Sequence, residues 1–124
     1  MNTKTLGDRG EAAVAEYLAQ KGLAILARKY RTPAGEIDLI VRDGRTLAFV
    51  EVKTRKSERY GRPGAAVGKE KQRRIIRGAL WYMNRTRGGE LPPCRFDVAE
   101  VYAPAGGAWR VRYLENAFEA DGIS

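Results

Sequence analysis

Two carboxylates and an amine lie within a short stretch of the chain: Asp38, Glu51 and Lys53. Carboxylate oxygens are the ligands that Mg²⁺ prefers, and the ion usually keeps several waters. Two carboxylates on one face of a sheet would therefore suit a half-open metal site. These residue types indicate carboxylate and lysine chemistry with an oxygen-loving divalent metal.

The two carboxylates belong to a predicted β-hairpin. Its strands are Glu36–Arg42 and Arg45–Lys53, and Asp43-Gly44 between them tolerates the positive φ that a two-residue turn requires. Such a turn makes Asp38 and Glu51 diagonal neighbours, roughly 7–8 Å apart at the backbone. The turn also predicts which residues face each other across the hairpin: Arg42 and Arg45, Ile40 and Leu47, Asp38 and Phe49, Glu36 and Glu51.

Alternation along these strands predicts one wholly apolar face, formed by Ile37, Leu39, Val41, Ala48, Val50 and Val52. The other face carries the carboxylates beside Ile40, Leu47 and Phe49, so it is partly covered. Covered carboxylates need a partner, which favours a bound cation. A simpler interpretation also fits, in which the polar residues mark the solvated side of an antiparallel pair.

The composition excludes several other mechanisms. The chain has no histidine and one cysteine, Cys94. Histidine-based triads, a His₃ zinc site, a structural zinc site and an internal disulfide are therefore ruled out. With 124 residues we expect a single domain over residues 1–124. No long apolar run and no signal-peptide core is present, which favours a cytoplasmic protein without membrane contact.

Positive charge is concentrated in residues 53–87. That stretch holds 12 Lys and Arg against two acidic residues, whereas the rest of the chain holds 11 basic and 13 acidic side chains. Such a block favours contact with a phosphate backbone. The predicted nucleic-acid contacts all lie in it: Arg55, Lys56, Arg59, Tyr60, Arg62, Lys69, Lys71, Arg73, Arg74 and Arg77.

Two predicted helices flank the hairpin. Thr5–Lys21 has an apolar stripe with Glu11 at its edge, where it could act as a third carboxylate. Val67–Arg87 carries Lys71 and Gln72 near its buried stripe, and a buried amide must be hydrogen-bonded or line a site. Both are therefore expected at the rim of the polar pocket. The stripe of this second helix is predicted to contain Val67, Ile75, Ile76, Ala79, Leu80 and Met83.

The order of the predicted elements defines the fold class. Leu23–Arg31 precedes the hairpin as an antiparallel strand, and Cys94–Val101 and Trp109–Leu114 follow the second helix as strands. The helix between the hairpin and Cys94–Val101 forms a crossover, which makes the strands that it joins parallel. We expect an α/β protein with a three-layer α/β/α fold, a mixed five-stranded sheet and a closing turn of helix at Asn116–Ala120.

Several segments together resemble a known superfamily, the PD-(D/E)XK nucleases: Glu11 in the first helix, Gly35-Glu36-Ile37-Asp38 and Phe49-Val50-Glu51-Val52-Lys53. Ile37 stands where the motif has a proline, a position that carries no chemistry. Further segments narrow the resemblance to the bacterial YraN family, small proteins considered distant relatives of archaeal Holliday-junction resolvases: Gly10-Glu11, Arg59-Tyr60-Gly61, Ala66-Val67, Lys71-Gln72-Arg73-Arg74, Arg95-Phe96-Asp97-Val98 and Asn116-Ala117-Phe118. The resemblance runs from about Gly7 to Phe118.

This resemblance implies a restriction-endonuclease-like fold and a Mg²⁺-dependent endonuclease, with Mn²⁺ as a substitute, that acts on branched or otherwise structured DNA. A homodimer would suit a symmetric junction. The implied metal ligands are Asp38, Glu51, the carbonyl of Val52, and Glu11. The implied catalytic residues are Asp38, Glu51, Lys53, Glu11 and Gln72. Two alternatives stay open: a module of the same fold that binds nucleic acid without cleaving it, and a protein that binds an acidic partner.

Overall fold

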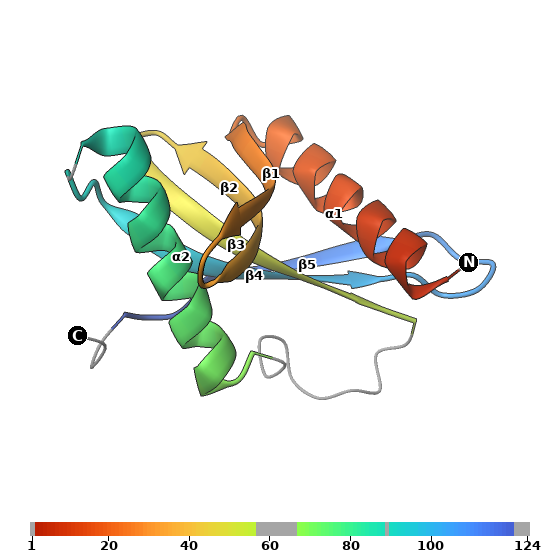
Figure 1. Ribbon diagram of the computed structural model, residues 1–124. Helices are drawn as coiled ribbons and strands as arrows, with labels where there is room; N and C mark the ends of the chain where they lie inside the picture. Colours follow the sequence, from red (N-terminus) through yellow and green to blue (C-terminus); the bar gives the residue numbers. More distant parts are fainter. Residues whose placement is uncertain (1, 57–66, 89, 121–124) are drawn as a thin grey trace.

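The structure is a computed structural model that describes residues 2–56, 67–88 and 90–120. The helices are α1 (Thr3–Gln20) and α2 (Lys69–Arg87). The strands are β1 (Ala24–Thr32), β2 (Gly35–Asp43), β3 (Thr46–Arg55), β4 (Cys94–Tyr102) and β5 (Arg110–Phe118). The elements follow one another in the predicted order (Figure 1).

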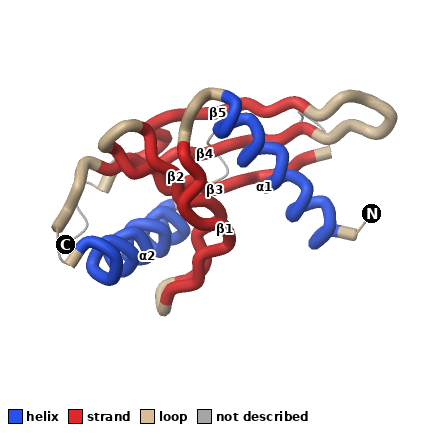
Figure 2. The backbone as a smooth tube through the Cα atoms, turned by 90° about the horizontal axis from the view of Figure 1, so that it is seen from above, coloured by secondary structure: helices blue, strands red, loops and turns tan. Residues whose placement is uncertain are grey.

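The five strands form one mixed sheet in the order β1-β2-β3-β4-β5. β3 and β4 are parallel, as the crossover predicts, and all other neighbours are antiparallel. α1 covers one face of the sheet and α2 the other (Figures 1 and 2), which confirms the three-layer α/β/α arrangement. Within the described ranges, no helix combines the length and apolarity needed to cross a bilayer.

Each layer boundary has its own apolar core. Between α2 and the sheet, Ile40 and Phe49 pack with Ile75 of the helix. Between α1 and the sheet, Val50 packs with Val14. Alternation along β3 explains this division, because Phe49 and Val50 point to opposite faces.

Two apolar positions differ from the prediction. Leu80 is exposed, and Tyr82 is buried in its place, because the stripe of α2 that faces the sheet is rotated towards Tyr82. Ile37 packs under α2 rather than with Leu39 under α1. The alternation of β2 changes phase between Ile37 and Leu39. On the neighbouring strand β1, Lys29 lies between the partners of these two residues and has a φ of 49°.

The predicted closing helix at Asn116–Ala120 is wrong. β5 continues to Phe118, where it pairs with Phe96 of β4. Asn116 has a φ of 51° and its amide donates a hydrogen bond to the Asp97 carboxylate. β5 is therefore distorted at Asn116 but continues as a strand.

Candidate metal centre

The hairpin turn is shifted by one residue from its predicted position. Asp43 pairs with Thr46, so the two central residues are Gly44 and Arg45. Gly44 has a φ of 61°, which glycine adopts without strain. Asp43 remains in the strand, where its carboxylate lies 2.9 Å from Nη1 of Arg95. The predicted cross-strand pairs are therefore wrong by two positions, an even shift that by itself moves no side chain to the other face. The apolar residues of the hairpin keep their predicted faces except Ile37, which packs under α2.

The corrected register places Asp38 opposite Glu51 rather than diagonal to it. Regular pairing of β2 with β3 ends at Leu39 and Val50, and the next residues on the two strands are Asp38 and Glu51. Beyond that point the Oδ2 atom of Asp38 accepts a hydrogen bond from the amide of Val52 at 2.8 Å. The Asp38 carboxylate thus lies between the two strands where their ladder stops.

Three carboxylates from two elements converge, and Asp38 is one of them. Glu11 of α1 and Glu36 and Asp38 of β2 each present an oxygen, and these three oxygens lie within 4.8 Å of one another. An octahedral Mg²⁺ with ligands at about 2.1 Å separates its ligand oxygens by about 3–4 Å. Small side-chain adjustments would therefore seat such an ion. Glu36 is not among the predicted ligands, although its position two residues before Asp38 on one strand could have identified it.

Glu51 lies next to Asp38 and is compensated by two lysines. Its side chain is 4% exposed, and its Oε2 atom lies 3.4 Å from Nζ of both Lys53 and Lys71. A buried carboxylate needs such partners, because its desolvation would otherwise destabilise the fold. The structure thus brings Lys53 of β3 and Lys71 of α2 together with the two carboxylates of the hairpin.

The surroundings of Asp38 raise its pKa to about 8. Burial is the main cause, because it disfavours the charged form. The neighbouring Glu51 raises the pKa further by repulsion and by a shared hydrogen bond, and Glu11 adds to the repulsion. The hydrogen bond from Val52 acts in the opposite direction. A hard divalent cation bound at this cluster would favour the ionised form of Asp38.

Lys29 compensates the charge of Glu11, the carboxylate from α1, when no such ion is bound. Its Nζ atom lies 3.0 Å from Glu11 and 2.7 Å from Asp8. The hydrogen bond with Asp8 is the main cause of a raised pKa at Lys29 and of a lowered pKa at Asp8. This contact could not be predicted from local sequence patterns, because Lys29 and Asp8 lie 21 residues apart.

The side-chain amide of Gln72 donates a hydrogen bond to the carbonyl of Val67, just before α2, at 2.9 Å. This contact meets the prediction that the amide needs a hydrogen-bond partner. Arg55 is 18% exposed and forms an ion pair with the buried Glu100 at 3.3 Å, so it is not the open surface cation that the sequence predicts. That the carbonyl of Val52 binds a metal stays a prediction.

The remaining predicted contacts of the basic block are divided in two. Five of them are exposed side chains: Lys56, Lys69, Arg73, Arg74 and Arg77. Arg59, Tyr60 and Arg62 lie outside the described residues.

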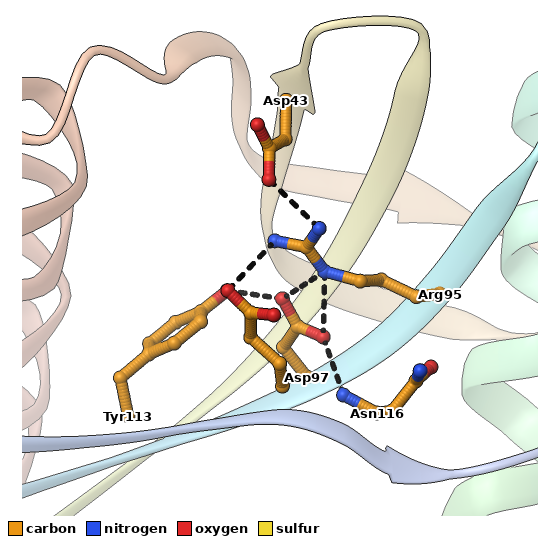
Figure 3. A network of polar contacts seen from close by, with 6 residues as sticks. Asp43, Arg95, Asp97, Tyr113 and Asn116 are labelled. Atoms are coloured by element: carbon orange, nitrogen blue, oxygen red, sulfur yellow. Dashed lines mark hydrogen bonds and ion pairs between the residues drawn. The ribbon is translucent and has the colours of Figure 1, made fainter.

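A buried polar network at the turn end of the sheet was not predicted (Figure 3). Asp97 is 0% exposed and accepts hydrogen bonds from Arg95, from the hydroxyl of Tyr113 and from the amide of Asn116. Arg95 also binds Asp43, which ties β4 to the hairpin turn. Burial, followed by the charge of Asp97, raises the pKa of Tyr113. The contact between Arg95 and Asp43 stabilises the observed turn, whose register places Asp38 opposite Glu51.

Comparison with known proteins identifies the family. The model of a family described as uncharacterised protein family UPF0102 matches residues 10–101. A UPF0102 protein of Symbiobacterium thermophilum is 52% identical over 118 residues, which cover 95% of this chain and 99% of that protein. UPF0102 proteins of Desulfosudis oleivorans and Syntrophotalea carbinolica are 47% and 46% identical, over 93% and 95% of this chain and 90% and 94% of their own lengths. The matched span includes all the carboxylates and lysines of the hairpin site, and the chain belongs to the UPF0102 family.

Proposed function

We propose that this protein is a metal-dependent DNA endonuclease of the PD-(D/E)XK superfamily that hydrolyses phosphodiester bonds in branched or otherwise structured DNA. The observation that carries the proposal is the convergence of oxygens from Glu11, Glu36 and Asp38 within 4.8 Å, beside Glu51 and Lys53. An aspartate on one strand and a Glu-x-Lys on the next is also the order of the superfamily motif that the sequence resembles.

The carboxylates of Glu11, Glu36 and Asp38 would hold Mg²⁺ or Mn²⁺, with Glu51 as the adjacent acidic group. When bound, the ion would activate a water and offset negative charge on the scissile phosphate. Asp38 would bind the ion in its ionised form. Because the pKa of Asp38 is raised to about 8 in the metal-free protein, ion binding near neutral pH should release the proton of this carboxyl group.

Lys53 and Lys71 are suited to phosphate binding. Both ammonium groups lie 3.4 Å from the same oxygen of Glu51, and both side chains remain partly exposed. Glu51 thus holds two positive charges at the rim of the carboxylate cluster, from β3 and from α2. A lysine in this position stabilises charge that develops on the phosphate during hydrolysis.

The positive charge of Lys53 and Lys71 continues in further exposed basic side chains of α2. Lys69, Arg73 and Arg77 lie on α2, the helix that also supplies Lys71. Cations of this kind bind the phosphate backbone and fix its position without reading base sequence. We therefore expect the protein to select DNA by shape, and a homodimer would match a symmetric junction.

A cleavage assay on matched DNA substrates tests the proposal. A four-way junction, a flap and a linear duplex would be incubated with Mg²⁺, Mn²⁺ or EDTA. We expect metal-dependent cleavage that falls by about a hundredfold or more in Asp38→Asn and Lys53→Met. The control Glu16→Gln, on the exposed side of α1, should cleave like the wild type.

Equal cleavage by Asp38→Asn and the wild type would contradict the proposal. DNA binding without cleavage under any metal condition would indicate the non-catalytic module instead. Absence of DNA binding even at low salt would favour an acidic protein partner, because backbone contacts strengthen as salt is lowered.

A further inference from the structure

A cavity of about 370 Å³ lies beyond the candidate metal centre, in the size range of ligand-binding pockets. It is formed by the first turns of α1, the end of β3 and the connection between β4 and β5, which lie at the same end of the molecule (Figures 1 and 2). Its lining includes Leu6 and Arg9 of α1, Lys56 after β3, and Pro104 and Trp109 of the connection. The lining contains two cations and, among the described residues, no carboxylate.

The walls of this cavity combine flat and charged surfaces. The guanidinium carbon of Arg9 lies 4.7 Å from the centroid of the Trp109 ring, so a cation is stacked on an indole. Nucleobases stack on both aromatic rings and guanidinium planes. Leu6 and Pro104 add apolar surface, and Lys56 is an exposed cation that could bind the phosphate next to a stacked base.

A close helix–strand contact joins the cavity to the candidate centre. Gly10 packs so tightly on β3 that an added Cβ would lie 1.8 Å from Oγ1 of Thr54. Its two neighbours in α1 are Arg9, which lines the cavity, and Glu11, which belongs to the carboxylate cluster. This contact therefore fixes the cavity and the cluster relative to each other.

The spacing along β3 suits a single DNA strand that spans both features. Lys53 beside the cluster and Lys56, which follows β3 and lines the cavity, are three residues apart, about 10 Å along the backbone at the rise of a β-strand. Stacked nucleotides rise by about 3.4 Å each, so the separation corresponds to roughly three nucleotide steps.

We propose that this cavity binds an unpaired nucleobase of a single-stranded tail or flap, while the duplex phosphates lie near the carboxylate cluster. This inference rests on the proposed function, because it takes DNA as the ligand. It narrows the substrate to structures that present an unpaired strand about three nucleotides from the site of hydrolysis.

Trp109 can report on its own occupancy. The chain has two tryptophans, and the other, Trp81, is exposed on α2, on the opposite side of the sheet from α1. The variant Trp81→Phe therefore isolates the fluorescence of Trp109 without altering the cavity. It would be titrated in EDTA with a duplex that carries a short single-stranded tail, with the same duplex carrying an abasic tail, and with a blunt duplex.

We expect the tailed duplex to quench Trp109 and the abasic and blunt duplexes to leave its fluorescence nearly unchanged. In separate binding measurements, Trp109→Ala should weaken binding of the tailed duplex by about tenfold or more, because a stacked base is lost. The same substitution should leave blunt-duplex affinity unchanged. Trp109→Phe, which keeps an aromatic face, should retain most of the preference, and Trp81→Ala serves as the matched control with no effect on it.

Equal affinity for the three DNAs, with no quenching of Trp109, would overturn the subsite. If metal-dependent cleavage persisted in that case, the proposed function would stand without it. Quenching by the tailed duplex with no cleavage under any metal condition would support the subsite and overturn the nuclease. Absence of binding to every DNA would overturn both.

Discussion

Replacing Asp38 by asparagine should stabilise the metal-free protein, and the gain should grow as the pH rises. In the folded protein the pKa of Asp38 is raised from 3.8 to about 8. Between these values the folded state holds a proton that the unfolded state has released, so the wild type loses stability as the pH increases. Asparagine has no charge to develop. Its advantage should therefore widen from about pH 4 to about pH 8 and stay constant above that.

The size of this effect follows from the same pKa. A shift from 3.8 to about 8 corresponds to at most about 6 kcal/mol of lost stability for the ionised form. Lys53 and Lys71 compensate the neighbouring Glu51, and hydration of the partly open site screens the repulsion further. We expect about 2–4 kcal/mol at alkaline pH, or roughly 6–16 °C in Tm for a chain of this length.

Thermal melts followed by circular dichroism in EDTA, at about pH 5, 7 and 9, measure this difference. The control Asp8→Asn removes a carboxylate whose pKa is lowered by its hydrogen bond with Lys29, so it should give no alkaline gain. A constant difference in Tm between Asp38→Asn and the wild type across this pH range would refute the reasoning. The same gain in Asp8→Asn would show that general charge reduction is responsible instead.

Three further substitutions test the supports of the site. Gly10→Ala should lower the free energy of unfolding by about 1–3 kcal/mol through its clash with Thr54, and Thr54→Ala should recover part of the loss; strictly additive losses in urea unfolding would contradict this. Arg95→Met should destabilise by about 3–5 kcal/mol because it leaves Asp97 buried without its cation, and a wild-type Tm would contradict that role. Lys71→Met should change the Tm little, because Lys53 still compensates the buried Glu51, but it should slow cleavage in the DNA assay; unchanged cleavage would remove Lys71 from the phosphate site.

The layer order and the sheet were predictable because they depend on local signals. Alternation identifies the strands, helical periodicity identifies α1 and α2, and a helix between two strands makes those strands parallel. That Asp38 and Glu51 lie close together was also predictable, because moving a two-residue turn by one residue changes the cross-strand pairing by two positions, which is an even shift.

The details that escaped prediction depend on residues far apart in sequence. The contact between Arg95 and Asp43, 52 residues apart, stabilises the observed turn, and local turn preferences do not include it. The change of face at Ile37 coincides with the positive φ of Lys29 in the neighbouring strand, and local alternation does not predict it. Tertiary contacts of this kind override local patterns, and here they decide which carboxylates meet.

The central claim is that the carboxylates of α1 and β2 bind one divalent cation. Anomalous diffraction from a crystal soaked in Mn²⁺ tests it directly, because the peak gives the ion's position. We predict a peak about 2.0–2.2 Å from oxygens of Asp38 and Glu11, with the Lys29 ammonium moved away from Glu11. No peak at this position, with Lys29 still bound to Glu11, would contradict the account.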